Sequence, residues 1–249
     1  MNRTLVITGG SKGLGWAIAE KYLQNGWCVV SGSRTKRLDI PESLTSKFLQ
    51  IEMDVKDRIS HKMLVSEAIA LTGQIDCFTN NAGYSEWRPL DQIDEEFLLN
   101  ILQTNLMGYF WGAQAAQAVM KPGSTITNIS SLAAKRGTPN NSAYVASKFG
   151  VTGLTQSLAK ELGPVGIRVN AICPVLVTTP GLTAALNQNS SPAEGDAENF
   201  LSNFAKTQTA LGFLPTAADV AELCYFLSGS GASAISGQSI NVDSGVLPN

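Results

Sequence analysis

Residues 5–15 read Leu5-Val6-Ile7-Thr8-Gly9-Gly10-Ser11-Lys12-Gly13-Leu14-Gly15, an apolar run that ends in a glycine-rich loop. A helical pattern follows and closes near Gly26, after which Trp27 to Val30 resume an apolar strand. In such a β-α-β unit the loop lies at the N-terminus of the helix, where backbone N–H groups and the helix dipole can hold a pyrophosphate. We therefore expect a phosphate-binding site at this loop.

The rest of the chain alternates strand-like runs with helical stretches. Such alternation favours a parallel sheet that helices cover on both faces. We expect a single α/β domain over residues 1–249, doubly wound in the Rossmann manner, with a mostly parallel sheet of about seven strands. The strands predicted after the first two are Phe48–Ile51, Ile75–Thr79, Ser124–Ile129, Ile167–Ile172 and Ser239–Val242.

Two helices are predicted to be long, one over about 95–120 and one over about 142–161. The first contains the small residues Gly112 to Ala116, which permit close packing either inside the subunit or against a second copy. Residues 180–214 form an irregular region in which 187–192 interrupt two short helix-like pieces. Long irregular regions are usually functional lids or disordered segments, and we expect a substrate lid here, with Leu211 and Phe213 among its apolar residues.

The composition limits the kinds of molecule that this protein is expected to bind. The formal net charge is −2 and only 15% of the 249 residues are charged. This balance offers no basic footprint for nucleic acid or anionic membranes. No apolar run approaches the roughly 18–20 residues that span a bilayer, and Met1 to Thr4 enter a strand without a signal-like segment. We expect a cytoplasmic protein that binds a small molecule, with no membrane or nucleic-acid partner.

The four cysteines suggest neither a metal site nor a redox motif. They are scattered in apolar surroundings, and none forms a C-x-x-C pair. We expect buried thiols and no bound metal. The cysteines are Cys28, Cys77, Cys173 and Cys224.

A competing interpretation of the glycine loop is a hydrolase. The run Gly9 to Gly13 also fits G-x-S-x-G, the nucleophile elbow of α/β-hydrolases. A serine hydrolase needs a histidine base, and the only histidine, His61, sits in a charged helical stretch. Several strands precede the elbow in that fold, whereas here the loop follows the first strand. The hydrolase is therefore disfavoured.

Further motifs lie in order along the chain. Asn80-Asn81-Ala82-Gly83 follows the fourth strand, Asn105 lies in the first long helix, and Ser131 precedes Tyr144-Val145-Ala146-Ser147-Lys148. Together with the glycine spacing Gly-x-x-x-Gly-x-Gly, these segments resemble the short-chain dehydrogenase/reductase family. The resemblance covers Thr8 to Gly245, which is nearly the whole chain.

The resemblance implies a catalytic set. Tyr144 would protonate a carbonyl oxygen as hydride arrives, Ser131 would hold that oxygen, and Lys148 would bind the nicotinamide ribose and lower the pKa of the tyrosine. Asn105 would bend its helix and hold a water that links Lys148 to solvent. Independently, Tyr144 and Lys148 are four residues apart and share one helix face. An ammonium near a phenol is expected to lower the phenol pKa from about 10.

The end of the second strand indicates the cofactor. Residues 31–35 carry no acid that could accept a hydrogen bond from a ribose 2′-hydroxyl, as NAD-binding proteins often do. Arg34 and Lys12 instead offer two cations for a 2′-phosphate. We therefore expect NADP(H).

The resemblance also implies the cofactor contacts. Asp54 and Val55 would contact the adenine, and Val177 and Thr179 would bind the nicotinamide carboxamide. Val175 and Ser244 depart from the family pattern, which has glycine at both positions. The full expected set is Gly9, Ser11, Lys12, Gly13, Leu14, Gly15, Ser33, Arg34, Asp54, Val55, Asn81, Ala82, Gly83, Tyr144, Lys148, Pro174, Val177 and Thr179.

These features lead us to expect an NADPH-dependent carbonyl reductase that acts on an apolar ketone or aldehyde. The pocket would be walled by the segments after Ser131 and Gly83, with Tyr84 and Trp87 nearby. The alternatives are a 3-oxoacyl-thioester reductase, an NADPH-using isomerase or dehydratase, and a regulator that binds NADPH without turnover. The family resemblance also implies a homo-oligomer built on the two long helices, a tetramer or a dimer.

Overall fold

A computed structural model describes residues 3–248; Met1, Asn2 and Asn249 lie outside the described residues. Seven strands form one sheet in the order β3-β2-β1-β4-β5-β6-β7, and every neighbouring pair is parallel. The expected sheet is confirmed, and in the described residues it is wholly parallel. The strands are β1 (Thr4–Thr8), β2 (Cys28–Ser33), β3 (Phe48–Glu52), β4 (Cys77–Asn80), β5 (Thr125–Ile129), β6 (Arg168–Pro174) and β7 (Ser239–Val242).

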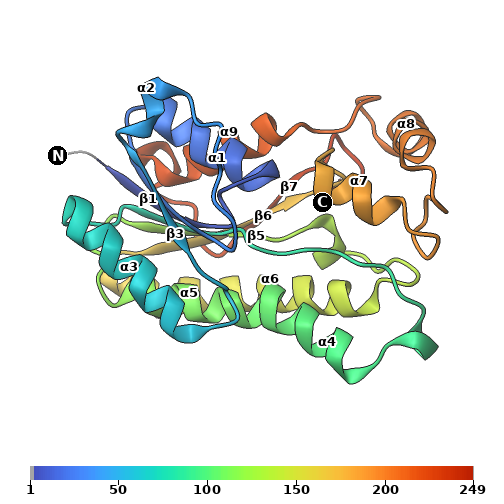
Figure 1. The fold of residues 1–249 in the computed structure, drawn as a ribbon, viewed down its shortest axis with the longest axis horizontal. Helices are drawn as coiled ribbons and strands as arrows, with labels where there is room; N and C mark the ends of the chain where they lie inside the picture. The colour runs from blue at the N-terminus through green and yellow to red at the C-terminus, as the bar shows by residue number, and fades with distance from the viewer. Residues whose placement is uncertain (1–2, 249) are drawn as a thin grey trace.

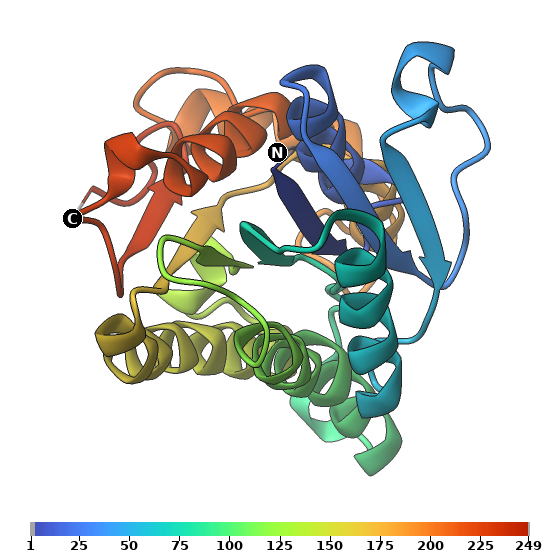
Figure 2. The same ribbon diagram turned by 90° about the vertical axis from the view of Figure 1, so that its left-hand side faces the viewer.

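Helices cover both faces of the sheet (Figures 1 and 2). One face carries α1 (Gly13–Gln24) and α9 (Ala217–Ser228), with the short α2 (Glu42–Thr45) beside them. The other face carries α3 (Arg58–Thr72), α4 (Glu95–Leu102), α5 (Gly108–Gln117) and α6 (Ser142–Leu162). The remaining two, α7 (Pro180–Leu186) and α8 (Ala197–Gln208), lie together at one end of the molecule.

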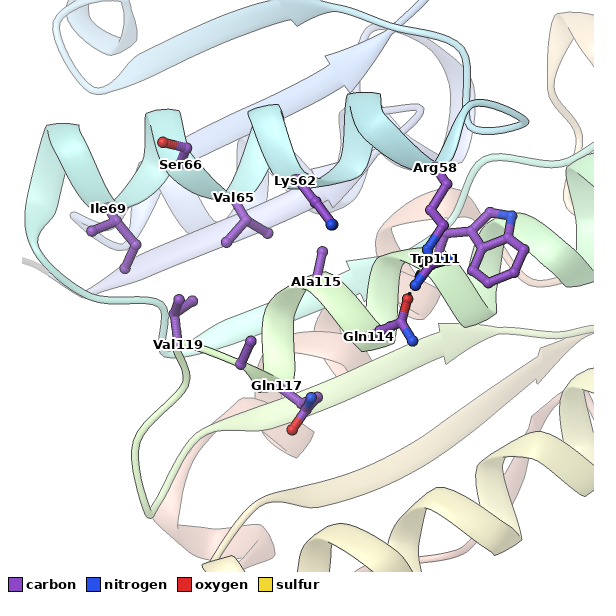
Figure 3. A pocket seen from close by; sticks show the side chains of 11 residues that line it. Arg58, Lys62, Val65, Ser66, Ile69, Trp111, Gln114, Ala115, Gln117 and Val119 are labelled. Atoms are coloured by element: carbon purple, nitrogen blue, oxygen red, sulfur yellow. Dashed lines mark hydrogen bonds between the residues drawn. The ribbon is translucent and has the colours of Figure 1, made fainter.

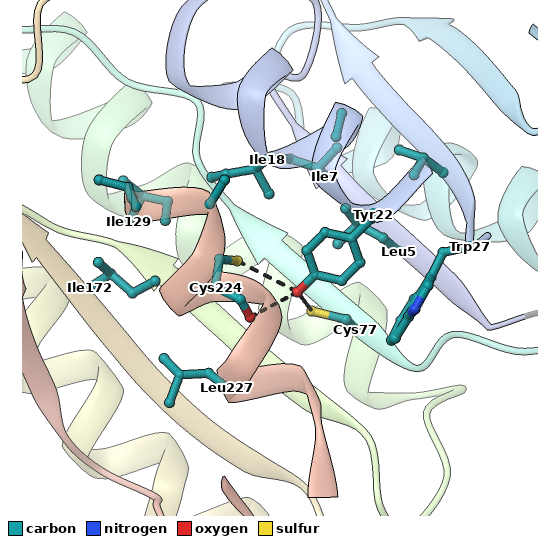
Figure 4. Close-up of a cluster of buried hydrophobic side chains, with 14 of the residues drawn as sticks. Leu5, Ile7, Ile18, Tyr22, Trp27, Cys77, Ile129, Ile172, Cys224 and Leu227 are labelled. Carbon is teal, nitrogen blue, oxygen red and sulfur yellow. Dashed lines mark hydrogen bonds between the residues drawn. The ribbon is translucent and has the colours of Figure 1, made fainter. Parts of the chain in front are cut away.

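The apolar run that opens the chain supplies both halves of the core. Successive side chains of a strand point to opposite faces of the sheet. Leu5 and Ile7 therefore pack with Tyr22 on the α1 and α9 side, which Figure 4 shows, while Val6 packs with Phe78 on the other side. A strand that is buried on both faces favours apolar residues at successive positions, and this is why Leu5, Val6 and Ile7 show no alternation in the sequence.

The first long helix is interrupted. The predicted helix over 95–120 consists of α4, a π-helical turn at Gln103–Met107, and α5, which ends at Gln117. The small residues of α5 pack inside the subunit, because a Cβ on Gly112 would lie 2.4 Å from the Asn80 Oδ1 atom and 2.8 Å from the Phe78 ring. This finding answers the question that the sequence left open for this stretch.

The segment between β6 and α9 folds as two helices that pack on the chain after β4. Trp87 is buried among Ala185, Leu186, Ala193 and Ala197, and Ser190 Oγ donates a 2.7 Å hydrogen bond to the Trp87 carbonyl oxygen. Two residues that we expected in this apolar lid are instead exposed to solvent, Leu211 (63%) and Phe213 (56%). They follow α8 in a loop that does not reach the cluster around Trp87.

All four cysteines are buried, as expected. Within residues 3–248 we find no helix with the length and apolar character that a membrane crossing would need.

Candidate active site

The predicted motifs meet at the carboxyl ends of the strands. The strand order reverses between β1 and β4, and in open parallel sheets ligands bind in the crevice outside such a switch point. The glycine loop follows β1, Asn81 to Gly83 follow β4, Ser131 follows β5, and residues 175–179 follow β6. One edge of the sheet thus collects segments that span most of the chain.

The glycine loop forms a tight cradle at the start of α1. Gly9 and Gly13 have left-handed backbone angles (φ +72° and +53°), which favour glycine. A Cβ on Gly15 would lie 2.1 Å from the Gly9 carbonyl oxygen, so the turn closes only with glycine there. No side chain caps the N-terminus of α1, and its first backbone N–H groups can serve a phosphate. The local geometry therefore fits a pyrophosphate.

Thr8 ties the glycine loop to the segment after β4. The Thr8 Oγ1 atom accepts hydrogen bonds from the backbone N–H groups of Asn81 (3.1 Å) and Ala82 (3.2 Å). The Asn81 side chain donates in return to the carbonyl oxygens of Thr8 (2.9 Å) and Gly9 (3.2 Å). The amide that we expected to contact the cofactor is used here to hold the cradle. The sequence shows Thr8 at the end of the first strand but does not indicate this role.

Ser131, Tyr144 and Lys148 come together as expected. Ser131 begins the short 3-10 helix Leu132–Ala134, and Tyr144 and Lys148 lie one turn apart on α6. The Lys148 Nζ atom is 5.7 Å from the centroid of the Tyr144 ring. A phenol, a hydroxyl and an ammonium group are thus present on neighbouring elements.

The expected pKa shift of Tyr144 is wrong for this structure. Burial raises the pKa of Tyr144, and a hydrogen bond with Ser131 lowers it by less. The Lys148 ammonium does not point at the phenol oxygen, because it donates to the Ile129 carbonyl oxygen (2.8 Å) and contacts the Tyr109 hydroxyl (3.4 Å). Burial lowers the pKa of Lys148 to about 8.

Asn105 lies inside the π-helical turn, which confirms an irregularity in the helix at this residue. The side chain is fully buried and binds the backbone of Tyr84 twice: Oδ1 accepts from the N–H group (3.0 Å), and Nδ2 donates to the carbonyl oxygen (2.8 Å). Nδ2 also reaches Ser147 Oγ (3.4 Å). Asn105 therefore holds the chain after β4 over Lys148. The water that we expected beside it stays a prediction.

A third cation lies at the end of β2. Lys12 and Arg34, which we expected to bind a 2′-phosphate, are both exposed, whereas Ser33 is half-buried. Arg37 returns toward the glycine loop, where its guanidinium lies 4.1 Å from the centroid of the Trp16 ring and its Nη1 atom 3.5 Å from the Ser11 carbonyl oxygen. The sequence shows that basic residues are concentrated at 34–37, but it does not show which of them folds back onto the glycine loop.

The other expected cofactor contacts have structural partners of their own. Asp54 Oδ1 accepts a 2.9 Å hydrogen bond from the Lys56 N–H group, and Val55 is buried. Val177 packs in the core, and Thr179 Oγ1 caps α7 by accepting from the Leu182 N–H group (3.2 Å). A Cβ on Gly13 would lie 3.7 Å from Thr179, so the segment after β6 reaches the glycine loop.

The two departures from the family pattern behave differently. Val175 does not adopt a left-handed backbone conformation, and its N–H group donates to the Val242 carbonyl oxygen (3.1 Å). Ser244 has φ +53°, a conformation that favours glycine. Its carbonyl oxygen accepts from the N–H groups of Ala210 and Leu211, which joins the chain after α8 to the C-terminal segment.

The hydrolase gains no support from the geometry. His61 lies on α3, which covers the opposite face of the sheet from α1. Its ring is fully buried, and Nε2 donates to the Val55 carbonyl oxygen (2.9 Å). Burial lowers the pKa of His61. The only histidine in the sequence is thus engaged away from Ser11.

A groove of about 500 Å³ lies between α3 and α5, outside the candidate active site (Figure 3). Arg58 and Lys62 lie on its α3 side, and Trp111 and Gln114 on its α5 side. None of its lining residues belongs to the candidate active site.

Comparison with known proteins gives consistent matches. A family model described as enoyl-(acyl carrier protein) reductase matches residues 9–247. The chain is 33% identical to an L-2,3-butanediol dehydrogenase of Corynebacterium glutamicum over 100% of both chains. It is 34% identical to a diacetyl reductase [(S)-acetoin forming] of Staphylococcus aureus over 98% of both. The ligand-free aldohexose dehydrogenase of Thermoplasma acidophilum superposes with a TM-score of 0.90 at 30% identity, over 98% of this chain and 94% of that one.

Proposed function

The chain belongs to the short-chain dehydrogenase/reductase family, and on that premise we propose that it is an NADPH-dependent carbonyl reductase that acts on a small ketone or aldehyde. The relatives are named as oxidoreductases of alcohols and ketones. The observation that carries the proposal is the meeting of Ser131, Tyr144 and Lys148 at the sheet edge that also holds the glycine cradle.

The choice of NADP(H) rests on charge at the end of β2. Neither Ser33 nor Arg34 offers the carboxylate that often accepts a hydrogen bond from a ribose 2′-hydroxyl. Lys12, Arg34 and Arg37 place three cations around the same end of the glycine loop. Arg37 is held by its contact with Trp16 and by an ion pair with Asp39 (2.7 Å). A guanidinium in a fixed orientation is well suited to a phosphate.

The residues of this chain would divide the remaining work. The bound nicotinamide supplies the hydride. Tyr144, which burial keeps protonated at neutral pH, would donate its proton to the carbonyl oxygen of the substrate. The Ser131 hydroxyl, which lowers the pKa of Tyr144, would hold that oxygen. Lys148 stays cationic below a pKa of about 8 and would stabilise the negative charge that develops on the phenol.

The substrate is proposed to be a small aliphatic ketone or diketone. The relatives named above act on butanediol and diacetyl. In this chain Trp87 joins α7 and α8 in one apolar cluster, and Ser190 fixes the Trp87 backbone. This apolar cluster packs against the chain after β4. It is consistent with a small substrate that reacts in a site from which water is excluded.

A second candidate is reduction of a 3-oxoacyl thioester, because the chain is also 31% identical, over 99% of its length, to a 3-oxoacyl-[acyl-carrier-protein] reductase of Staphylococcus aureus. The two candidates differ in the length of the substrate beyond the carbonyl group. A panel that contains diacetyl, acetoin and an acetoacetyl thioester would separate them through kcat/KM.

The first test is a parallel fluorescence titration with NADPH and NADH, followed by that substrate panel. We expect tighter binding of NADPH and oxidation of NADPH when diacetyl is added. Preference for NADH would overturn the cofactor proposal. Binding of NADPH without turnover of any carbonyl compound would overturn the proposed reaction.

A further inference from the structure

Two donors converge on one backbone oxygen at the end of β5. The Tyr109 hydroxyl and the Lys148 ammonium each donate a 2.8 Å hydrogen bond to the Ile129 carbonyl oxygen. The Lys148 Nζ atom also lies 3.4 Å from the Tyr109 hydroxyl oxygen. The three groups form a closed triangle behind the proposed proton donor.

The ring of Tyr109 supplies another contact to the same cation. The Lys148 Nζ atom is 5.1 Å from the centroid of that ring, within the range of a cation–π interaction. Both side chains are almost completely buried, at 1% exposure for Tyr109 and 4% for Lys148. None of the ion pairs among residues 3–248 includes Lys148. A buried ammonium needs compensating polar contacts, and here the Ile129 carbonyl oxygen and Tyr109 provide them.

We propose that Tyr109 is a positioning residue that holds the Lys148 ammonium in its buried site and keeps it protonated. The proposal rests on the proposed role of Lys148 in the reductase reaction. Tyr109 acts through Lys148 and touches neither substrate nor cofactor in this role.

The fold holds Tyr109 in place from both sides. It follows Gly108, where a Cβ would lie 3.1 Å from the Val55 carbonyl oxygen, so α5 approaches the chain closely at this point. The Tyr109 carbonyl oxygen accepts from Asn80 Nδ2 (3.3 Å), which also donates to Asn128 Oδ1 (2.9 Å). These contacts anchor the helix on β4 and β5 and leave the hydroxyl in one position.

The direction of the effect follows from the groups that face Lys148. They are Tyr109 on α5, Tyr144 on its own helix, and Cys173 on β6. Burial lowers the pKa of Lys148 to about 8. An oxygen that accepts a hydrogen bond from an ammonium favours the charged form. Removal of the Tyr109 hydroxyl should therefore lower the pKa of Lys148 further.

The test compares Tyr109→Phe with Tyr22→Phe. Tyr22 is also fully buried, and its hydroxyl donates to a backbone carbonyl oxygen, that of Cys224 (2.9 Å), on the opposite face of the sheet (Figure 4). Both variants lose one buried tyrosine hydroxyl, and both keep the ring. A merely structural role would therefore affect Tm in the two variants alike and leave Lys148 unchanged.

The readout is the protonation of Lys148 itself. In protein labelled with 13C at lysine Cε, the Lys148 resonance is assigned through its absence in Lys148→Met and followed from pH 6 to pH 10 without cofactor. We expect a midpoint lower by up to about one unit in Tyr109→Phe, and no shift in Tyr22→Phe. We also expect kcat to fall about tenfold in Tyr109→Phe and its alkaline limb to move to lower pH, with KM little changed.

An unchanged Lys148 midpoint in Tyr109→Phe would overturn the proposal, as would equal shifts in both variants. The NMR titration does not depend on turnover. If the wild-type chain and the variants all fail to reduce a carbonyl compound, the proposed function is wrong. The titration still decides the role of Tyr109 in that case.

Discussion

Tyr144 illustrates how burial can outweigh a neighbouring charge. The Tyr–Lys spacing on one helix face indicates a phenol with a lowered pKa, yet burial raises it in this structure. A raised pKa keeps the acid form in place at neutral pH, which suits a residue that must deliver a proton. Approach of the Lys148 cation would lower the pKa only if its ammonium left the Ile129 carbonyl oxygen.

Tyr144→Phe tests the proton donor directly. We expect carbonyl reduction to fall by about 10²–10⁴-fold, because the ring keeps its place while the acidic hydroxyl is lost. NADPH affinity from fluorescence titration should change little. Full activity in this variant would rule out Tyr144 as the proton donor.

Lys148→Met tests how much burial of the Lys148 ammonium lowers the free energy of unfolding. Burial lowers the pKa of Lys148 from 10.5 to about 8, so the charged form is disfavoured in the folded protein. We expect the variant to lose activity and yet gain on the order of 2 kcal/mol of stability at pH 7, measured by urea unfolding.

The pH dependence of that stability difference tests the direction of the pKa shift of Lys148. The folded protein loses the Lys148 proton near pH 8, whereas the unfolded chain holds it to about pH 10.5. The cost is therefore fully present below pH 8 and is relieved as the pH rises through this window. The two stability curves should converge between these values. A gap that widens with pH would contradict the assigned shift.

At the scale of secondary structure elements, the turns at the ends of strands and helices form the site. The strands and α6 are predicted within about three residues, because a strand buried on both faces and an amphipathic helix leave clear patterns in the sequence. The π-helical turn around Asn105 has no such pattern. It is stabilised by contacts with Tyr84 and Ser147, which lie far away in the sequence.

Asn105→Ala would leave the backbone N–H and carbonyl groups of Tyr84 without their partners. We expect a loss of about 1–3 kcal/mol in the free energy of unfolding. The Tyr84 amide should also exchange its hydrogen faster, since its N–H group donates to the Asn105 Oδ1 atom. Unchanged exchange at Tyr84 would show that other contacts hold the segment.

Gly15→Ala tests the phosphate cradle. A methyl group there would lie 2.1 Å from the Gly9 carbonyl oxygen, so the loop must open. We expect NADPH affinity to fall at least about 100-fold, the loss of roughly 3 kcal/mol of binding free energy. Gly153→Ala on α6 is the matched control. Its Cβ would meet nothing within 4 Å, and it should retain binding and gain about 0.5–1 kcal/mol of stability.

At the scale of the whole molecule, exposed apolar side chains gather on the neighbouring helices α4, α5 and α6. Phe110 and Phe149 are each 47% exposed, and Leu98, Leu99 and Met107 are 38–44% exposed. Exposed apolar clusters of this kind mark interaction surfaces. They support our proposal that these helices form the interface of a homo-oligomer.

Phe110→Glu combined with Phe149→Glu tests that interface. We expect the wild-type chain to scatter light as a multiple of 26.4 kDa, four chains or two, and the double variant to move toward the mass of one chain. Charge buried at an apolar interface without a partner is strongly unfavourable, which gives the direction. An unchanged mass in the double variant would place the interface elsewhere.

The sequence by itself determined the order of the strands and helices along the chain, the glycine loop and the choice of Ser131, Tyr144 and Lys148 as candidate site residues. These features depend on local backbone preferences and on motif spacing. Only the tertiary structure decided where the Lys148 ammonium points, that Arg37 folds back to Ser11, and that Tyr109 shares the Ile129 oxygen. Hydrogen bonds and burial join residues that are distant in sequence, so the protonation of each group depends on its neighbours in the fold.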